Sequence, residues 1–273
     1  MALLFGGLAV AAGVIGRTLI DSGVAAVPSG TPGKLLWIVA PALLALGFRR
    51  LDPATRGRHL FALSRKPLVA AAIVAALTAV AAGVAIALGL AAGALAFAPA
   101  GVPAATLATS AASIALFAFL EESAWRGYLL PGLLPRVRYA VAVGVSSLVW
   151  WAWHLPYLDQ LSRVYTRESA ISIAPRLLLG VMAMQVLYTE VFLRYRSVWP
   201  AFAMHASFNL VANLAILSGL KLTGHLPWLL SPSADSVLLI VLSGGIGLWL
   251  YRRRRAAGPV TEPDARPADD PAL

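Results

Sequence analysis

Long apolar stretches separated by short polar loops dominate this chain of 273 residues. A helix that crosses the roughly 30 Å hydrocarbon core of a bilayer needs about 20 apolar residues. Eight stretches approach or exceed this length, although the second is short and contains Pro41. They lie near residues 2–20, 34–48, 67–98, 103–131, 138–155, 174–193, 198–218 and 235–251. The pattern predicts an all-α fold, a polytopic transmembrane helix bundle of about eight spans.

Composition supports the same interpretation. Hydrophobic residues make up 59% of the chain, charged residues 12%, and the mean hydropathy is +0.78. A soluble domain carries roughly 25% charged residues. We therefore predict one integral membrane domain over residues 1–255. The segment 256–273 is rich in proline and acidic residues, which predicts a disordered cytoplasmic tail.

The net charge of +10 comes from basic residues clustered in short loops between apolar segments. This pattern orients membrane helices and argues against a nucleic-acid partner. If the N-terminus is cytoplasmic, the inner side holds fifteen basic residues and the outer side six. The inner set is Arg49, Arg50, Arg56, Arg58, Arg65, Lys66, Arg126, Arg136, Arg138, Arg194, Arg196 and Arg252 to Arg255, and the outer set is Arg17, Lys34, Arg163, Arg167, Arg176 and Lys221. The bias predicts that both termini are cytoplasmic.

Ala- and Arg-rich composition is typical of a GC-rich bacterial genome, so we expect the chain in a bacterial cytoplasmic membrane. The sequence contains no cysteine, which excludes disulfides, iron–sulfur clusters and thiolate zinc sites.

Two adjacent carboxylates interrupt the apolar run ALFAFLEESAWRGYLL. Charged side chains in hydrocarbon cost a few kcal/mol each or more, and they usually mark functional sites. Glu122 and Arg126 are four residues apart with the acid first, the favourable order for a helical ion pair. Glu121 then lies on a different face and is a candidate general base. The alternative is an ion pair at the membrane interface, with Glu121 reaching toward water.

Polar residues also interrupt two later apolar stretches. His154 ends the run LVWWAWH, either as part of an interfacial aromatic belt or as an imidazole that holds a water molecule. His205 and Asn209 are four residues apart and share one helix face with Asn213. These residues predict either an interhelical hydrogen bond or a polar cavity.

Two chemical arrangements fit these residues. In the first, Glu121 and His154 bind and deprotonate water, while His205 and Asn209 donate to the oxyanion of a tetrahedral intermediate. In the second, Glu121, His154 and His205 hold a zinc ion that activates the water. Asn209 is a poor zinc ligand, which favours an oxyanion role for it, but the sequence leaves both arrangements open.

The segments EESAWRG, WWAWH and HASFN, in this order on successive apolar helices, resemble the three motifs of the CAAX protease and bacteriocin-processing (CPBP) family of intramembrane proteases. The resemblance covers about residues 103–218. One departure is Trp150, which stands where the second motif usually begins with Phe.

The resemblance implies that Glu121 is the catalytic base and that His154 helps to activate the water. It implies that His205 and Asn209 stabilise the oxyanion, or that His205 joins a metal site, with Glu122 and Arg126 in support. Both metal-dependent and metal-free glutamate mechanisms are associated with the family.

We therefore expect an intramembrane endopeptidase. Its partners would be the lipid bilayer and a peptide or protein substrate, with a C-terminal or leader peptide as candidates. A bacterial origin argues against a prenylated substrate. Two alternatives use the same polar residues: a non-catalytic membrane binding or immunity protein, and a small proton-coupled transporter.

The sequence predicts different depths in the membrane for the carboxylate of Glu121 and the imidazole of His154. Glu121 lies about 8 Å along its helix from Arg126, whereas His154 lies about 24 Å from Arg138. The two groups can meet if Arg126 is itself buried, or if residues 132–145 lie partly along the membrane surface.

Overall fold

Eight long helices follow the eight predicted stretches in the computed structural model, which describes residues 1–21, 31–165, 168–224 and 226–257. They are α1 (Ala2–Asp21), α2 (Thr31–Leu51), α3 (Arg65–Ala91), α4 (Ala104–Ala124), α6 (Tyr139–His154), α8 (Ala170–Tyr195), α9 (Trp199–Leu217) and α11 (Val237–Ala256). The prediction of an all-α bundle is confirmed. The tail predicted for 256–273 lies outside the described residues from 258 onward.

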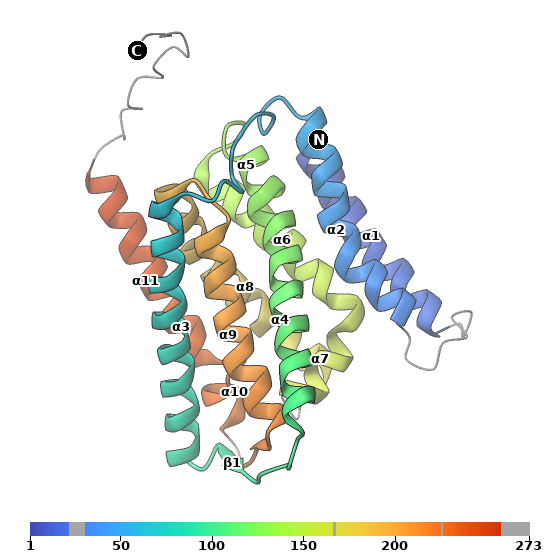
Figure 1. Ribbon diagram of the computed structural model, residues 1–273, viewed down its shortest axis with the longest axis vertical. Helices are drawn as coiled ribbons and strands as arrows, with labels where there is room; N and C mark the ends of the chain where they lie inside the picture. Colours follow the sequence, from blue (N-terminus) through green and yellow to red (C-terminus); the bar gives the residue numbers. More distant parts are fainter. Residues whose placement is uncertain (22–30, 166–167, 225, 258–273) are drawn as a thin grey trace.

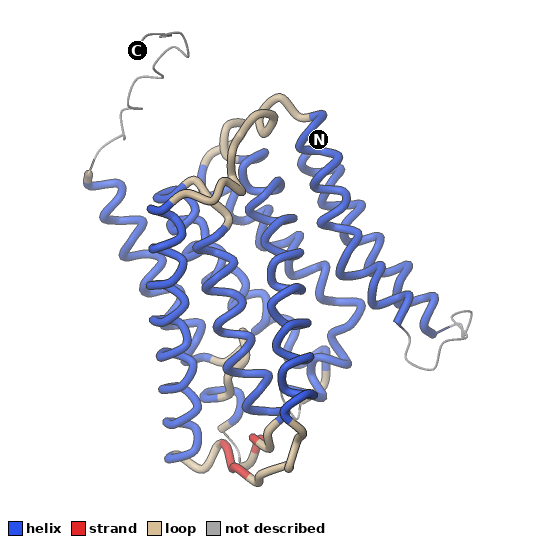
Figure 2. Tube along the Cα trace, viewed as in Figure 1, coloured by secondary structure: helices blue, strands red, loops and turns tan. Residues whose placement is uncertain are grey.

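Short elements join the long helices. They are β1 (Leu95–Phe97), the π-helical turn η1 (Trp125–Leu129), α5 (Leu130–Leu133), the 3₁₀ turn η2 (Leu155–Tyr157), α7 (Leu158–Tyr165), β2 (Leu220–Leu222) and α10 (Pro227–Leu230). Strands β1 and β2 pair antiparallel, with Ala96 opposite Lys221. Figure 2 shows that the connections gather at the two ends of the bundle.

Five segments of the described chain are long and apolar enough to cross a membrane. They are Ala2–Asp21, Arg65–Ala91, Ala104–Leu133, Ala170–Tyr195 and Trp199–Leu217. The third segment continues from α4 through η1 and α5. The number of spans and the side of the termini stay predictions.

The two ends of the bundle differ in what they carry (Figure 1). One end, called the α5 end below, holds α5, the N-terminus and the end of α11. The opposite end, called the β1 end, holds β1, α7 and α10. Helix α1 packs on α2, α9 packs on both α3 and α4, and α8 packs on both α6 and α11.

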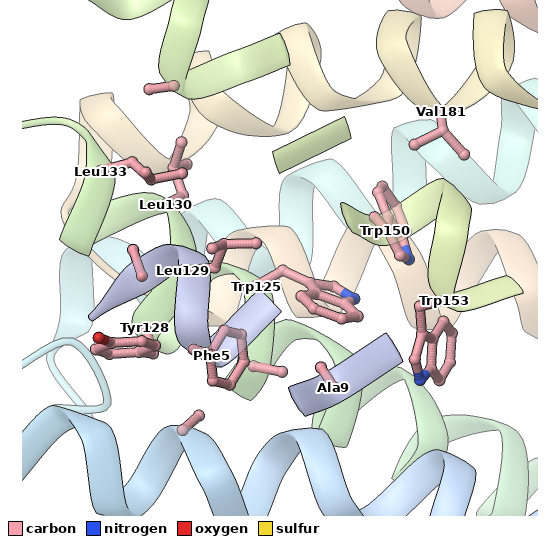
Figure 3. Close-up of a cluster of buried hydrophobic side chains, with 14 of the residues drawn as sticks. Phe5, Ala9, Trp125, Tyr128, Leu129, Leu130, Leu133, Trp150, Trp153 and Val181 are labelled. Carbon is pink, nitrogen blue, oxygen red and sulfur yellow. The ribbon is translucent and has the colours of Figure 1, made fainter. Parts of the chain in front are cut away.

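An aromatic core fixes the N-terminal helix against the π-helical turn. The ring of Phe5 meets Trp125 and Tyr128 edge-on, at centroid distances of 6.2 and 4.9 Å. Figure 3 shows Phe5 and these two rings with Trp150 and Trp153 beyond them. Edge-to-face pairs add about 0.5–1.5 kcal/mol each beyond the burial of their area. This core therefore sets the position of η1, and with it that of Arg126.

Close backbone approach brings α1 and α2 together. A Cβ atom on Gly16 would lie 2.4 Å from the carbonyl oxygen of Gly33, and one on Gly33 would lie 2.2 Å from that of Gly16. Only glycine fits at either position, because any side chain would force the two helices apart.

A buried carboxylate joins two loops at the α5 end. Asp52 is fully buried, accepts a hydrogen bond of 3.1 Å from Arg136 Nη1, and accepts one of 3.0 Å from the hydroxyl of Tyr128. Burial alone would raise the pKa of Asp52, but hydrogen bonds from Arg136, the Ala54 N–H and Tyr128 together lower it below its ordinary value of 3.8.

We expect this carboxylate to make stability depend on acid. Because the folded-state pKa is lowered, the contribution of Asp52 is present above the ordinary carboxyl range and is lost as pH falls through the folded value. The wild-type melting temperature should therefore fall more steeply below about pH 4 than that of Asp52→Asn. Thermal unfolding followed by tryptophan fluorescence measures this. Asp21→Asn, at a side chain that is 57% exposed, is the control and should behave like the wild type.

Candidate active site

Three helices bring the predicted polar residues to one cavity of about 440 Å³. Helix α4 provides Glu121, α6 ends at His154, and α9 provides His205 and Asn209. All four side chains line the cavity. The predicted convergence of these residues is therefore observed.

Glu122 and Arg126 lie behind this cavity and form the predicted ion pair. Their side chains are 3.0 Å apart and both are 0% exposed. The guanidinium also donates a hydrogen bond of 2.8 Å to Oε1 of Gln185 on α8. The pair is therefore buried inside the bundle and is not an exposed bridge on the surface of the protein.

Burial of Arg126 also settles the disagreement in depth. The residue does not mark the membrane surface, because it lies inside the bundle within the π-helical turn. A π-helical turn makes i→i+5 hydrogen bonds and is common at functional sites. Glu121 and His154 line the same cavity, as the first of the two predicted explanations, a buried Arg126, allows.

Two neighbouring rings of the cavity wall, with centroids 6.2 Å apart, lie against the buried guanidinium. The Cζ atom of Arg126 is 4.8 Å from the ring centroid of Trp150 and 4.5 Å from that of Tyr188. Cation–π contacts of this kind contribute up to about 2 kcal/mol where water is excluded. Sequence analysis missed Gln185 and Tyr188, although Gln185 in an apolar stretch was a usable signal, and Tyr188 follows it by three residues on the same helix face.

Glu121 is held by a donor that sequence analysis did not assign. The indole Nε1–H of Trp150 donates a hydrogen bond of 3.0 Å to Glu121 Oε2. Two neighbouring tryptophans donate instead to backbone carbonyls: Trp151 to Ala174 at 2.9 Å, and Trp153 to Trp37 at 3.0 Å. Of the tryptophans on α6, Trp150 is the one that orients the candidate base.

Both imidazoles are anchored through Nδ1. Nδ1 of His154 lies 2.8 Å from the Trp150 carbonyl oxygen, which can only accept, so this nitrogen carries a proton and donates. Nδ1 of His205 lies 2.9 Å from Oε1 of Glu122, the oxygen that also pairs with Arg126. It therefore donates to a carboxylate. In each neutral ring, Nε2 is then free to accept a proton or to bind water.

Comparison with known families supports the motif resemblance. Residues 103–211 match the model of the family described as Rce1-like, type II CAAX prenyl endopeptidase Rce1-like. This part of the chain is an Rce1-like segment. The family predicted from the three motifs is thereby confirmed over these residues. A search of curated proteins finds no match.

The Rce1-like segment runs from the start of α4 into α9 and contains all six predicted site residues. The helices α1 to α3, which pack around it, lie outside the match. Together with the five apolar segments long enough to cross a bilayer, the match to a family of membrane peptidases identifies the chain as an integral membrane protein.

The predicted zinc arrangement does not fit the donor set. Among the residues that the structure describes, no three His, Cys, Asp or Glu side chains lie close enough together to hold one metal ion. The candidates Glu121, His154 and His205 are all described, and they form no such group. We derive no catalytic step through zinc.

Trp150 stands where the second family motif usually begins with Phe, and this difference gives a testable prediction. Trp150→Phe removes the N–H donor to Glu121 and keeps an aromatic ring beside Arg126. Hydrogen bonds to charged groups contribute about 1.5–3 kcal/mol, so we expect peptide hydrolysis to fall about ten- to hundredfold. Steady-state kinetics of the purified variant measure kcat.

Trp151→Phe is the matched control, because it also loses one indole donor and Trp151 does not line the cavity. It should lower thermal stability and keep kcat within about threefold of the wild type. Equal losses of kcat in the two variants would contradict a specific role for Trp150.

Proposed function

We propose that this protein is an endopeptidase of the bacterial cytoplasmic membrane and hydrolyses a peptide bond by direct attack of water within the bundle. The observation that carries the proposal is the meeting of Glu121, His154, His205 and Asn209 in one cavity whose remaining wall is mostly apolar. The match of residues 103–211 to a peptidase family supports the same reaction class.

The proposed first step is activation of water. Glu121, oriented by Trp150, and His154, anchored through Nδ1, both line the cavity and would hold one water molecule between the carboxylate and Nε2. Glu121 takes a proton from this water as its oxygen bonds to the carbonyl carbon of the substrate. The carbonyl oxygen becomes negatively charged in the tetrahedral intermediate.

Residues on α9 would stabilise the oxyanion. The side-chain amide of Asn209 supplies N–H donors, and it lies one helical turn from His205. His205 donates from Nε2 only when both ring nitrogens carry protons, because Nδ1 already donates to Glu122. Collapse of the intermediate breaks the C–N bond, and the proton held by Glu121 passes to the leaving amine.

The role of Asn209 is tested by Asn209→Ala. Loss of one oxyanion donor typically lowers kcat about 10²–10³-fold, with little change in KM. The measurement is hydrolysis of a quenched fluorescent apolar peptide by the purified protein in nanodiscs. Asn213→Ala, one turn further along the same face, is the control and should retain most of the activity. Full kcat in Asn209→Ala would contradict the proposed oxyanion site.

A further inference from the structure

Basic residues distinguish the two ends of the bundle. The α5 end carries Arg49, Arg50, Arg56, Arg58, Arg65, Lys66, Arg136, Arg138, Arg194, Arg196 and Arg252 to Arg255. The β1 end carries far fewer within the described residues, namely Arg17, Lys34, Arg163, Arg176 and Lys221. Burial of Arg126 removes one residue from the predicted inner set, and the bias remains large. Lys and Arg accumulate in cytoplasmic loops, so this asymmetry assigns the α5 end to the cytoplasm.

The cavity of the candidate site reaches the other end. Its lining includes Lys34 at the start of α2, Gln160 on α7, and Ser233 and Asp235 in the segment before α11. All of these elements belong to the β1 end (Figure 1). Lys34 is exposed, and the side chains of Gln160 and Ser233 are partly exposed.

Packed side chains close the cavity toward the α5 end. Glu122 and Arg126 are fully buried beneath the site. Beside them, Phe119 stacks on Trp199 at 5.8 Å, and the indole N–H of Trp199 donates to the Phe61 carbonyl at 3.1 Å. These contacts hold the connection between α2 and α3 against the start of α9. None of the residues Phe61, Phe119, Glu122, Arg126 and Trp199 lines the cavity.

We propose that the substrate is an extended, apolar polypeptide segment that enters this cavity from the non-cytoplasmic face of the membrane. The proposal rests on the proposed function for its chemistry, and on charge asymmetry and cavity shape for its direction. A bond in a cytoplasmic C-terminal peptide could not reach Glu121 without opening the packed α5 end.

The length of the cavity limits the conformation that the substrate segment can have. Along α8, the lining extends from Ile173 to Tyr188, which is about 22 Å at 1.5 Å per residue. An extended chain advances at most about 3.3–3.6 Å per residue, so about seven residues must enter before a peptide bond reaches the deep end. A folded domain is too wide to do this. The segment must therefore be unfolded or lie beside a membrane anchor.

The walls of the cavity select apolar side chains. Between the mouth and the site they are formed mainly by aliphatic and aromatic residues from α4, α8 and α9. These are Ile114, Phe117, Ile173, Leu177, Val181 and Phe208. Each polar side chain brought into this part without a partner would lose its hydration, which disfavours its binding.

Cysteine labelling tests the direction without requiring activity, because the native chain contains no cysteine. Single variants place a thiol at the mouth (Gln160→Cys), near the site (Met184→Cys) and in the exposed loop at the α5 end (His59→Cys). A small, charged, membrane-impermeant thiosulfonate is applied to bacterial spheroplasts and, separately, to inverted vesicles.

We expect Gln160→Cys and Met184→Cys to react in spheroplasts, and His59→Cys to react only in inverted vesicles. Reaction of Met184→Cys only on the side where His59→Cys reacts would overturn the proposal. So would reaction of His59→Cys in spheroplasts, or failure of Met184→Cys to react from either side.

A cleavage assay in the same cells separates this inference from the proposed function. One apolar ten-residue segment is placed next to a single membrane anchor, on either the outer or the cytoplasmic side. Cleavage of the outer reporter alone is expected, and cleavage of the cytoplasmic reporter alone would overturn the direction of entry. If neither reporter is cleaved while labelling follows the expected pattern, the cavity direction stands and the peptidase assignment fails.

Discussion

Glu121→Gln is expected to lower peptide hydrolysis by about 10²–10⁴-fold, the range associated with loss of a positioned general base. The amide oxygen of Gln can still accept the indole hydrogen bond of Trp150, so the side chain should keep its place. It cannot take a proton from water. We therefore expect kcat to fall with little change in KM or in melting temperature.

Purified wild-type and variant proteins in nanodiscs, assayed with one fluorogenic apolar peptide, provide the measurement. Asp21→Asn neutralises an exposed carboxylate at the end of α1 and should retain full activity. Turnover by Glu121→Gln at the wild-type rate would remove Glu121 from the mechanism.

The second large effect concerns stability. Arg126→Ala leaves the Glu122 carboxylate buried without its cation and removes the donor to Gln185. Breaking a buried ion pair from one side costs about 3–5 kcal/mol, because an uncompensated charge remains in a low-dielectric interior. Loss of the ring contacts with Trp150 and Tyr188 adds to this cost. We expect a large fall in the free energy of unfolding, measured by denaturant titration in mixed micelles.

Two further variants separate charge from packing. Arg17→Ala breaks a partly exposed bridge to Asp159 and should cost no more than about 1 kcal/mol. The double variant Glu122→Gln, Arg126→Met removes both charges and keeps most of the volume, so it should recover much of the loss. Equal stability of Arg126→Ala and Arg17→Ala would show that the buried pair contributes no more to the stability of the bundle than the partly exposed one.

The positions of the helices were predictable because apolar length alone defines a membrane helix. The short amphipathic helix α7 and the pair β1–β2 were not predicted, since they form within loops and depend on tertiary contacts. The π-helical turn at Trp125–Leu129 was likewise invisible, because no residue type in WRGYL requires it.

The residues that line the site were predictable from the sequence, whereas the contacts that hold them in place were less so. Glu121, His154, His205 and Asn209 stood out as polar residues in apolar stretches, and they line one cavity. An i, i+4 pair such as Glu122 and Arg126 has the same sequence pattern whether it is exposed or buried, so its depth came only from the fold. The donor role of Trp150 depends on the distance between α4 and α6, which no sequence pattern contains.

The claim that water itself attacks the peptide carbonyl is tested most directly by a single-turnover reaction in water enriched in oxygen-18, with enzyme in excess over peptide. Direct attack predicts one oxygen-18 atom in the new peptide carboxylate after the first turnover, and none in Glu121. Attack by the Glu121 carboxylate would expel the amine and form a mixed anhydride, and hydrolysis at its Glu121 carbonyl would release a peptide without oxygen-18 and leave oxygen-18 in Glu121. Mass spectrometry of the peptide and of the digested protein distinguishes the two results, and the second would contradict this account.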